Sequence, residues 1–236
     1  SAAMMTALAG ALDATAADAS VRAVILAADG PAFCAGHDLK EMTARRADPD
    51  GGKAFYDALF RQCSELMLKI VRHPRPVIAM VHGLATAAGC QLVASCDLAM
   101  AAESASFATP GVNIGLFCST PMVALSRNLG RKQAMEMLLT GESLSAAAAL
   151  AMGLINRVVP DAELDSYVDD YCKRIGENAP LTMHAAKRTI EELTRLDGKP
   201  DFGRTSALVQ ECFASEDYIE GRTAFMEKRK PQFKGR

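Results

Sequence analysis

The same order of elements, a buried strand, a glycine-containing turn and then a helix, occurs twice in the first hundred residues. The two strand segments are VRAVILA at residues 21–27 and VIAMV at residues 77–81. Continuous apolar runs of this length, rich in β-branched residues, predict strands buried on both faces. Helices are expected after the turns, near Asp38 and at residues 91–96. The pattern predicts an α/β fold built around buried strands.

The remaining periodicity fills in this α/β plan and makes the last third of the chain helical. Further strands are expected at residues 98–101, 106–108 and 154–159, and a mobile polar loop at residues 45–53. Further helices are expected at residues 4–12, 54–71, 121–129, 132–139, 146–151, 162–176, 181–196 and 206–228. We divide the chain into an α/β core, residues 1–160, and a helical region, residues 161–236, packed on the core or on a neighbouring subunit.

Composition excludes several classes of function. The 236 residues carry 26 Lys plus Arg against 28 Asp plus Glu, a net charge of −2, which lacks the basic excess of general nucleic-acid binding. Seven cysteines without CxxC spacing indicate reduced thiols in a reducing compartment, with no metal site. No apolar run approaches the roughly 18 residues of a membrane span, and no secretory signal is recognised. We expect a cytoplasmic protein without a membrane partner, or one of the mitochondrial matrix in a eukaryote. The helical pattern at residue 1 suggests missing upstream residues.

Two turns share a design suited to binding a developing negative charge. Ala35, Gly36, His37 and Asp38 form the first, and Ala87, Ala88 and Gly89 form the second. Small residues allow close approach to the main chain, and the first N–H groups of a helix have no partner within it. Two such donors that converge would form an oxyanion hole, in which one donor stabilises a transition state by about 2.7–4 kcal/mol. The alternative is that these glycines only permit close packing of helix on strand.

Several ordered motifs resemble the crotonase (enoyl-CoA hydratase/isomerase) superfamily. The motifs are FCAGHDLKE at residues 33–41, VIAMVHG at 77–83, AGCQL at 88–92 with SCD at 95–97, and FATPG at 107–111, continued by LLTGE, AMGLI and AFMEKRKP further along. The resemblance covers nearly the whole chain. The family's opening strands are absent from this sequence, which fits missing upstream residues. It implies a spiral of ββα turns, a C-terminal helical trimerisation region, a homotrimer or a dimer of trimers, and an acyl-CoA thioester as ligand. No separate cofactor is expected, since coenzyme A is part of the substrate.

The resemblance also assigns the site residues. The oxyanion donors are the backbone N–H groups of His37 and Ala88, the latter replacing a usual glycine, which is tolerable if its φ is negative. Residues expected to line the substrate or CoA site are Ala35, Gly36, Asp38, Leu39, Lys40, Gly89, Cys118, Lys228 and Lys230. As part of a charge run with Arg229, the two C-terminal lysines also fit a solvated helix end.

The two catalytic glutamates of the family's hydratases are absent. Gln91 and Gly111 occupy their positions. Adding water to an enoyl thioester needs a base and an acid, whereas an amide has no proton affinity near neutral pH and glycine has no side chain. Ordinary two-glutamate hydration is therefore not expected.

Other side chains near these motifs have alternative interpretations. His37 titrates in the range for acid–base chemistry, but a structural role is favoured for a side chain on the oxyanion turn. The Cys118 thiol is either a nucleophile for thioester hydrolysis or a packed core thiol. Asp38 is expected to cap a helix, and Asp97 to close a turn. His73, His82 and His184 are expected to be structural.

The sequence thus predicts an acyl-CoA-binding, enoyl-CoA hydratase-like lyase of fatty acid metabolism that polarises the thioester carbonyl, with weak or altered hydratase activity. The alternatives are a non-catalytic acyl-CoA-binding or regulatory protein, and an acyl-CoA thioesterase.

Overall fold

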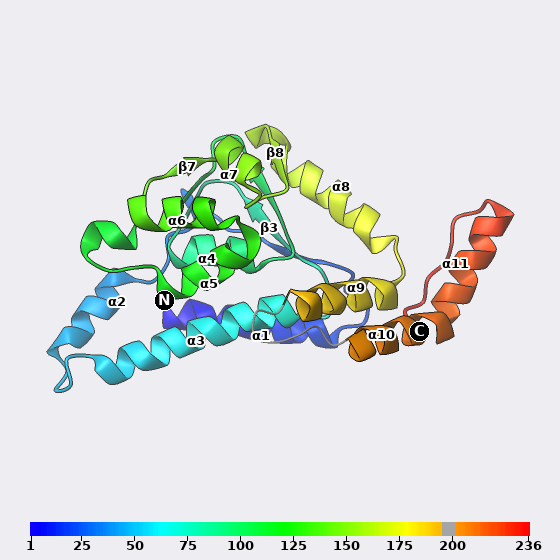
Figure 1. Ribbon diagram of the computed structural model, residues 1–236, viewed down its shortest axis with the longest axis horizontal. Helices are drawn as coiled ribbons and strands as arrows, with labels where there is room; N and C mark the ends of the chain where they lie inside the picture. The colour runs from blue at the N-terminus through cyan, green and yellow to red at the C-terminus, as the bar shows by residue number, and fades with distance from the viewer. Residues whose placement is uncertain (195–201) are drawn as a thin grey trace.

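A computed structural model describes residues 1–194 and 202–236 and shows two four-stranded sheets surrounded by helices (Figure 1). The strands are β1 (Val24–Leu26), β2 (Ala32–Cys34), β3 (Val77–Val81), β4 (Leu84–Thr86), β5 (Leu98–Ala102), β6 (Ser106–Ala108), β7 (Leu144–Ser145) and β8 (Arg157–Val159). The helices are α1 (Ala2–Ala17), α2 (Leu39–Ala44), α3 (Lys53–Arg72), α4 (Ala88–Ser95), α5 (Ser119–Asn128), α6 (Arg131–Thr140), α7 (Ala146–Met152), α8 (Leu164–Gly176), α9 (Pro180–Leu193), α10 (Phe202–Ala214) and α11 (Glu216–Glu227).

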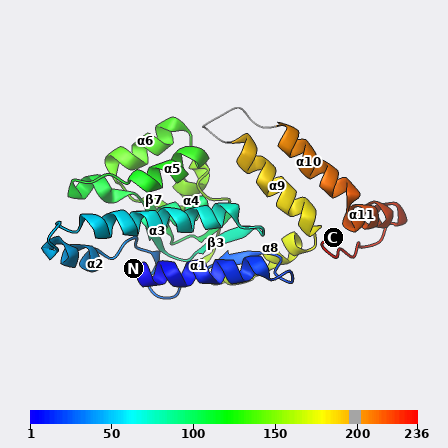
Figure 2. The same cartoon turned by 90° about the horizontal axis from the view of Figure 1, so that it is seen from below.

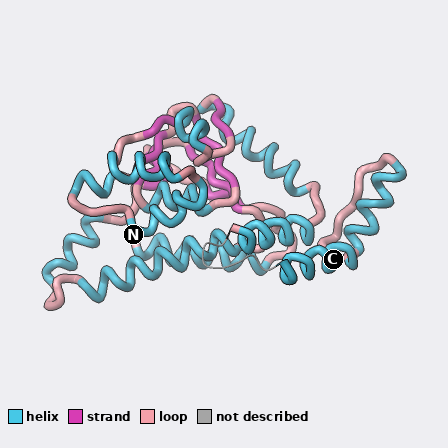
Figure 3. Tube along the Cα trace, in the orientation of Figure 1, coloured by secondary structure: helices cyan, strands magenta, loops and turns pink. Residues whose placement is uncertain are grey.

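Strands from successive turns of the chain alternate between the two sheets. One sheet has the order β1-β3-β5-β8 with every pair parallel, and the other has the order β2-β4-β6-β7 with only β6 and β7 antiparallel. A helix follows each pair of strands in the spiral, which confirms the predicted α/β, ββα architecture. The strands are grouped together and the helices wrap around them (Figure 3).

The core lies between the sheets and the long helices. Ile70 of α3, Val77 of β3, Phe107 of β6 and Leu125 of α5 are fully buried together. α1 and α3 run side by side along one edge of the molecule, whereas α9, α10 and α11 lead away from the sheets (Figures 1 and 2). None of the helices in the described part of the chain combines the length and apolarity that crossing a membrane requires.

Three expected elements differ from the structure for local reasons. The single helix expected over residues 206–228 is two helices, because the Ser215 hydroxyl accepts a hydrogen bond from Tyr218 N and caps α11. The strand expected from residue 154 begins at Arg157, since the Leu154 N–H donates to Ala149 O and closes the end of α7. The expected end of a helix at Leu196 lies outside the described residues. Part of the loop expected at residues 45–53 is a short 3₁₀ helix, Arg45–Ala47.

Candidate functional site

The first turn connects β2 to α2 through Gly36, whose φ is +91°. Its helix is capped by Asp38, whose Oδ1 accepts hydrogen bonds from Glu41 N at 3.2 Å and Lys40 N at 2.9 Å. These two bonds lower the pKa of the Asp38 carboxyl. The side chain of Asp38 therefore faces its own helix, as a capping residue does.

The second turn connects β4 to α4 through Ala87, which has φ 52° and ψ −118°. The Ala87 N–H donates to Ala108 O at 2.9 Å, and its carbonyl accepts from Gln91 N at 3.1 Å. Ala88 is the first residue of α4 and does not have a positive φ. The backbone of Ala88 is therefore unstrained, as an alanine at this position requires, and the unusual conformation falls on the preceding alanine.

The two turns lie against each other. A Cβ placed on Gly36 would lie 3.2 Å from Ala87 Cβ, 3.3 Å from Thr86 O and 3.4 Å from Ala88 N. A Cβ placed on Gly89 would lie 2.0 Å from Cys34 O. Glycine is required at position 89 because the first turn of α4 meets the end of β2 main chain to main chain.

Both predicted oxyanion donors are available. Within residues 1–194 and 202–236, neither the His37 N–H nor the Ala88 N–H donates to another group of the chain. The Ala88 N–H is one of the unpartnered groups that begin a helix, where the helix dipole also favours negative charge. The structure thus places two unpartnered main-chain donors on neighbouring turns.

The His37 side chain packs against α3. Its ring lies edge to face with Phe60, with the ring centroids 5.4 Å apart and the planes at 79°. Burial lowers the pKa of the imidazole below its usual value, so the ring is neutral at pH 7. This packing accounts for the side chain without a catalytic role.

Gln91 is buried one helical turn beyond Ala88. Only 5% of the residue is exposed, and its Oε1 accepts a hydrogen bond from Thr120 Oγ1 of α5 at 3.0 Å. In the described part of the chain this is the only hydrogen bond of the Gln91 side chain.

Gly111 lies in a 3₁₀ turn, Pro110–Ile114, against the residues that precede α5. A Cβ at this position would lie 3.1 Å from Cys118 Sγ and 3.2 Å from Cys118 N. Cys118 therefore packs closely on the backbone of Gly111, and a side chain at position 111 would have to displace it. Cys118 Sγ has no hydrogen-bond partner among the described residues. Burial raises the pKa of the neighbouring Cys90 thiol to about 12.

The sequence profile described as "Enoyl-CoA hydratase/isomerase" matches residues 1–236. The chain belongs to the enoyl-CoA hydratase/isomerase family. Human mitochondrial enoyl-CoA hydratase domain-containing protein 3 is 47% identical over 211 residues, which are 89% of this chain and 68% of that protein. Its crystal structure is 44% identical, with a TM-score of 0.87 over 98% of this chain and 90% of that chain. An enoyl-CoA hydratase structure from Mycobacterium smegmatis is 47% identical, with a TM-score of 0.87 over 98% of this chain and 88% of that chain.

The C-terminal lysines that the family resemblance points to lie far from the two turns. Lys228 follows α11 directly, at the end of the molecule opposite α2 (Figures 1 and 2), and Lys230 pairs with Glu177. The structure does not bring Lys228 or Lys230 to the turns of their own chain.

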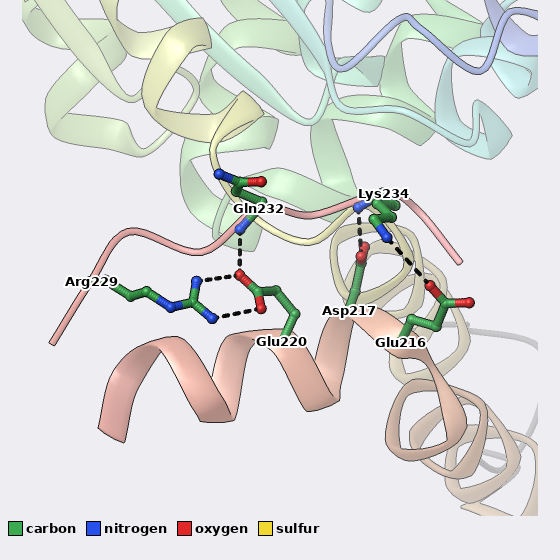
Figure 4. A pocket seen from close by; sticks show the side chains of 6 residues that line it. All are labelled: Glu216, Asp217, Glu220, Arg229, Gln232 and Lys234. Carbon is green, nitrogen blue, oxygen red and sulfur yellow. Dashed lines mark hydrogen bonds and ion pairs between the residues drawn. The ribbon is translucent and has the colours of Figure 1, made fainter. Parts of the chain in front are cut away.

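A cavity of about 460 Å³ beside α11 is lined by charged and polar side chains that pair with other groups of the C-terminal segment (Figure 4). Arg229 donates to both oxygens of Glu220 at 2.6 and 2.9 Å, and Asp217 accepts from Lys234 N at 2.6 Å and from Gly235 N at 2.9 Å. These contacts hold the C-terminal segment on α11, so we assign the cavity no ligand. Among the described residues, no group of three or more His, Cys, Asp or Glu is arranged to hold a metal ion.

Two polar residues with contacts to predicted residues, Thr120 and Lys187, were not singled out in the sequence analysis. Thr120 contacts Gln91 only because α4 and α5 pack together, and no local pattern marks that contact. Lys187 of α9 donates to Asp97 Oδ2 at 2.6 Å, and the same oxygen accepts from Val77 N at 2.7 Å. Asp97 thus connects α9 to the sheet and does more than close a turn. His73 is buried and bonded to main-chain atoms, as expected.

Proposed function

We propose that this family member binds an acyl-CoA thioester and holds its carbonyl oxygen between the N–H groups of His37 and Ala88. The proposal is carried by one observation: two donors without partners lie on turns so close together that a Cβ on Gly36 would lie 3.4 Å from Ala88 N. A thioester oxygen gains negative charge when a reaction occurs at the neighbouring carbons, and preorganised main-chain donors stabilise that charge.

The proposed activity is hydratase-like but weak or altered. Gln91 offers an amide where a general base is needed, and Gly111 offers nothing. Gln91 orients water or a polar acyl group instead of removing a proton. Because no proton carrier replaces the two glutamates at these positions, a non-catalytic acyl-CoA-binding or regulatory protein is the second candidate.

We further propose that the chain forms a homotrimer or a dimer of trimers through its C-terminal helices. Large apolar side chains are exposed there, including Phe225 at 85% and Met226 at 75%. Exposed apolar residues gathered on helices that leave the core are typical of an association surface. Lys228 and Lys230, with the first-turn residues Ala35, Leu39 and Lys40, remain candidate CoA contacts in such an assembly.

Incubation with crotonyl-CoA tests this function. Calorimetry measures binding, loss of the conjugated enoyl absorbance measures hydration, and a thiol reagent measures release of free CoA. We expect binding with little or no hydration even at high protein concentration. Rapid hydration would contradict the inference that hydration needs carboxylates at positions 91 and 111. Absence of binding would contradict the proposed oxyanion site. Release of CoA would favour a thioesterase that uses Cys118 or water.

The variant Gln91→Glu with Gly111→Glu tests whether the missing carboxylates limit the rate. We expect a gain in hydration. The new Cβ at position 111 must displace Cys118 by a few tenths of an ångström, so a thermal melt should accompany the assay. A folded variant that binds without any gain would show that the acyl group is placed differently from that of a hydratase.

A further inference from the structure

The hydrogen bond between Thr120 and Gln91 determines which face of the amide is available to a ligand. Thr120 Oγ1 donates to Gln91 Oε1 at 3.0 Å, so the amide oxygen is engaged and the amide nitrogen is turned away from Thr120. That nitrogen has no hydrogen-bond partner in the described part of the chain.

The amide nitrogen is open rather than sealed in the core. Among the described residues, the only fully enclosed side-chain nitrogen or oxygen without a partner is Arg75 Nε. Gln91 Nε2 also has no partner, but unlike Arg75 Nε it is not fully enclosed. This nitrogen therefore keeps some exposure to solvent although the residue is only 5% exposed. A buried amide whose unpartnered donor is not fully enclosed is suited to binding an acceptor atom of a ligand, since an unpaired donor is costly.

The position of this donor relative to the oxyanion site fixes where that acceptor would be. Gln91 follows Ala88 by three residues on α4, so both lie on one face of the helix, about 4.5 Å apart along its axis. A group that meets Gln91 while the thioester oxygen meets Ala88 is therefore on the acyl carbons next to the carbonyl.

We propose that Gln91, oriented by Thr120, selects acyl-CoA thioesters with a carbonyl oxygen on the third acyl carbon, and that Thr120 is a positioning residue. This inference rests on the proposed function. An oxo group accepts hydrogen bonds and donates none, which matches a site that presents only N–H. Gln91 and Thr120 are neutral and provide no charge to balance a carboxylate.

Acetoacetyl-CoA and butyryl-CoA are a matched pair of probes, because both acyl groups have four carbons and differ only in the oxygen on the third. We expect acetoacetyl-CoA to bind about three- to tenfold more tightly, as one additional hydrogen bond to a buried amide provides. Gln91→Leu and Thr120→Val should bring the ratio of the two Kd values close to one. Thr120→Ser should restore it, because serine keeps the hydroxyl.

Thr140→Val is the control for loss of a threonine hydroxyl. Among the described residues, the exposed Thr140 Oγ1 at the end of α6 donates to Glu136 O and accepts from Glu142 N, and has no other hydrogen bond. The Kd ratio of this variant should match that of the unmodified protein. A merely structural role for Thr120 would weaken both ligands equally and leave the ratio unchanged, which would overturn the positioning role. Equal Kd values in the unmodified protein would overturn the selectivity alone, whereas failure of both ligands to bind would overturn the proposed function.

Discussion

Gly36 and Ala87 face each other across the two turns so closely that a Cβ on Gly36 would lie 3.2 Å from the Cβ of Ala87. Both residues have positive φ, 91° and 52°. Alanine rarely adopts this conformation, which costs about 1–3 kcal/mol. The ψ of Ala87 directs the next peptide, so the strained residue positions the N–H of Ala88 beside the first turn. Strain maintained at this point is an expected feature of a binding site.

Ala87→Gly should stabilise the fold. Relief of the backbone strain should add about 1–3 kcal/mol of stability. Glycine also makes the unfolded chain more flexible, which should remove only about 0.4–1 kcal/mol. Ala88→Gly is the matched control, because Ala88 is helical and should lose up to about 1 kcal/mol. Urea unfolding measures both changes. If the two variants shift the midpoint in the same direction, Ala87 is not strained.

Gly36→Ala should abolish acyl-CoA binding as well as reduce stability. The new methyl group would lie 3.4 Å from Ala88 N, in the space between the turns. Gly30→Ala is the control: its φ is +93°, but no atom lies within 4 Å of the new Cβ. Both variants carry similar backbone strain, so only Gly36→Ala should lose affinity for butyryl-CoA. Equal affinities in the two variants would place the ligand elsewhere.

His37→Leu should change the affinity for butyryl-CoA by less than about threefold. The proposed contact uses the main-chain N–H, and the neutral ring packs on Phe60, where leucine can also pack. Calorimetry between pH 5.5 and 8 measures the affinity. A loss greater than tenfold, or a pH dependence that disappears in the variant, would assign the imidazole a direct role.

The C-terminal segment should detach from α11 in acid. The Arg229 guanidinium and then the Gln232 N–H lower the pKa of Glu220 to about 2. A depressed carboxyl pKa stabilises the folded form above the unfolded pKa of about 4.3, and this contribution is lost as the pH falls toward 2. Carbon NMR titration of Glu220 should give this low pKa, and Arg229→Leu should raise it. Arg131→Leu, an exposed change on α6, should leave it unchanged. A Glu220 pKa near 4 in the unmodified protein would contradict the role of these bonds to Glu220 in holding the C-terminal segment on α11.

Local patterns were sufficient to predict most of the fold. The apolar runs of β3 and β5 and the periodicity of α3 are strong signals, because they are continuous and end at prolines or polar residues. The break at Ser215 was missed, since a serine with helix-forming neighbours on both sides becomes a cap only when the following helix changes direction.

The residues of the candidate site could be named from the sequence, but the contacts between them could not. Main-chain donors at residues 37 and 88 follow from the turns and the family resemblance. The strain on Ala87 and the bond from Thr120 to Gln91 depend on how distant segments pack, namely β2 against α4 and α4 against α5. Contacts between segments distant in sequence produce no periodic pattern of residues from which they could be predicted.

Difference infrared spectroscopy of butyryl-CoA labelled with ¹³C at the thioester carbonyl tests the central claim most directly. In the proposed complex the N–H groups of His37 and Ala88 donate two hydrogen bonds that polarise the carbonyl, so its stretching frequency should fall when the ligand binds. The shift should remain in Gly30→Ala and in His37→Leu. A bound ligand whose carbonyl frequency equals that in water would contradict the account.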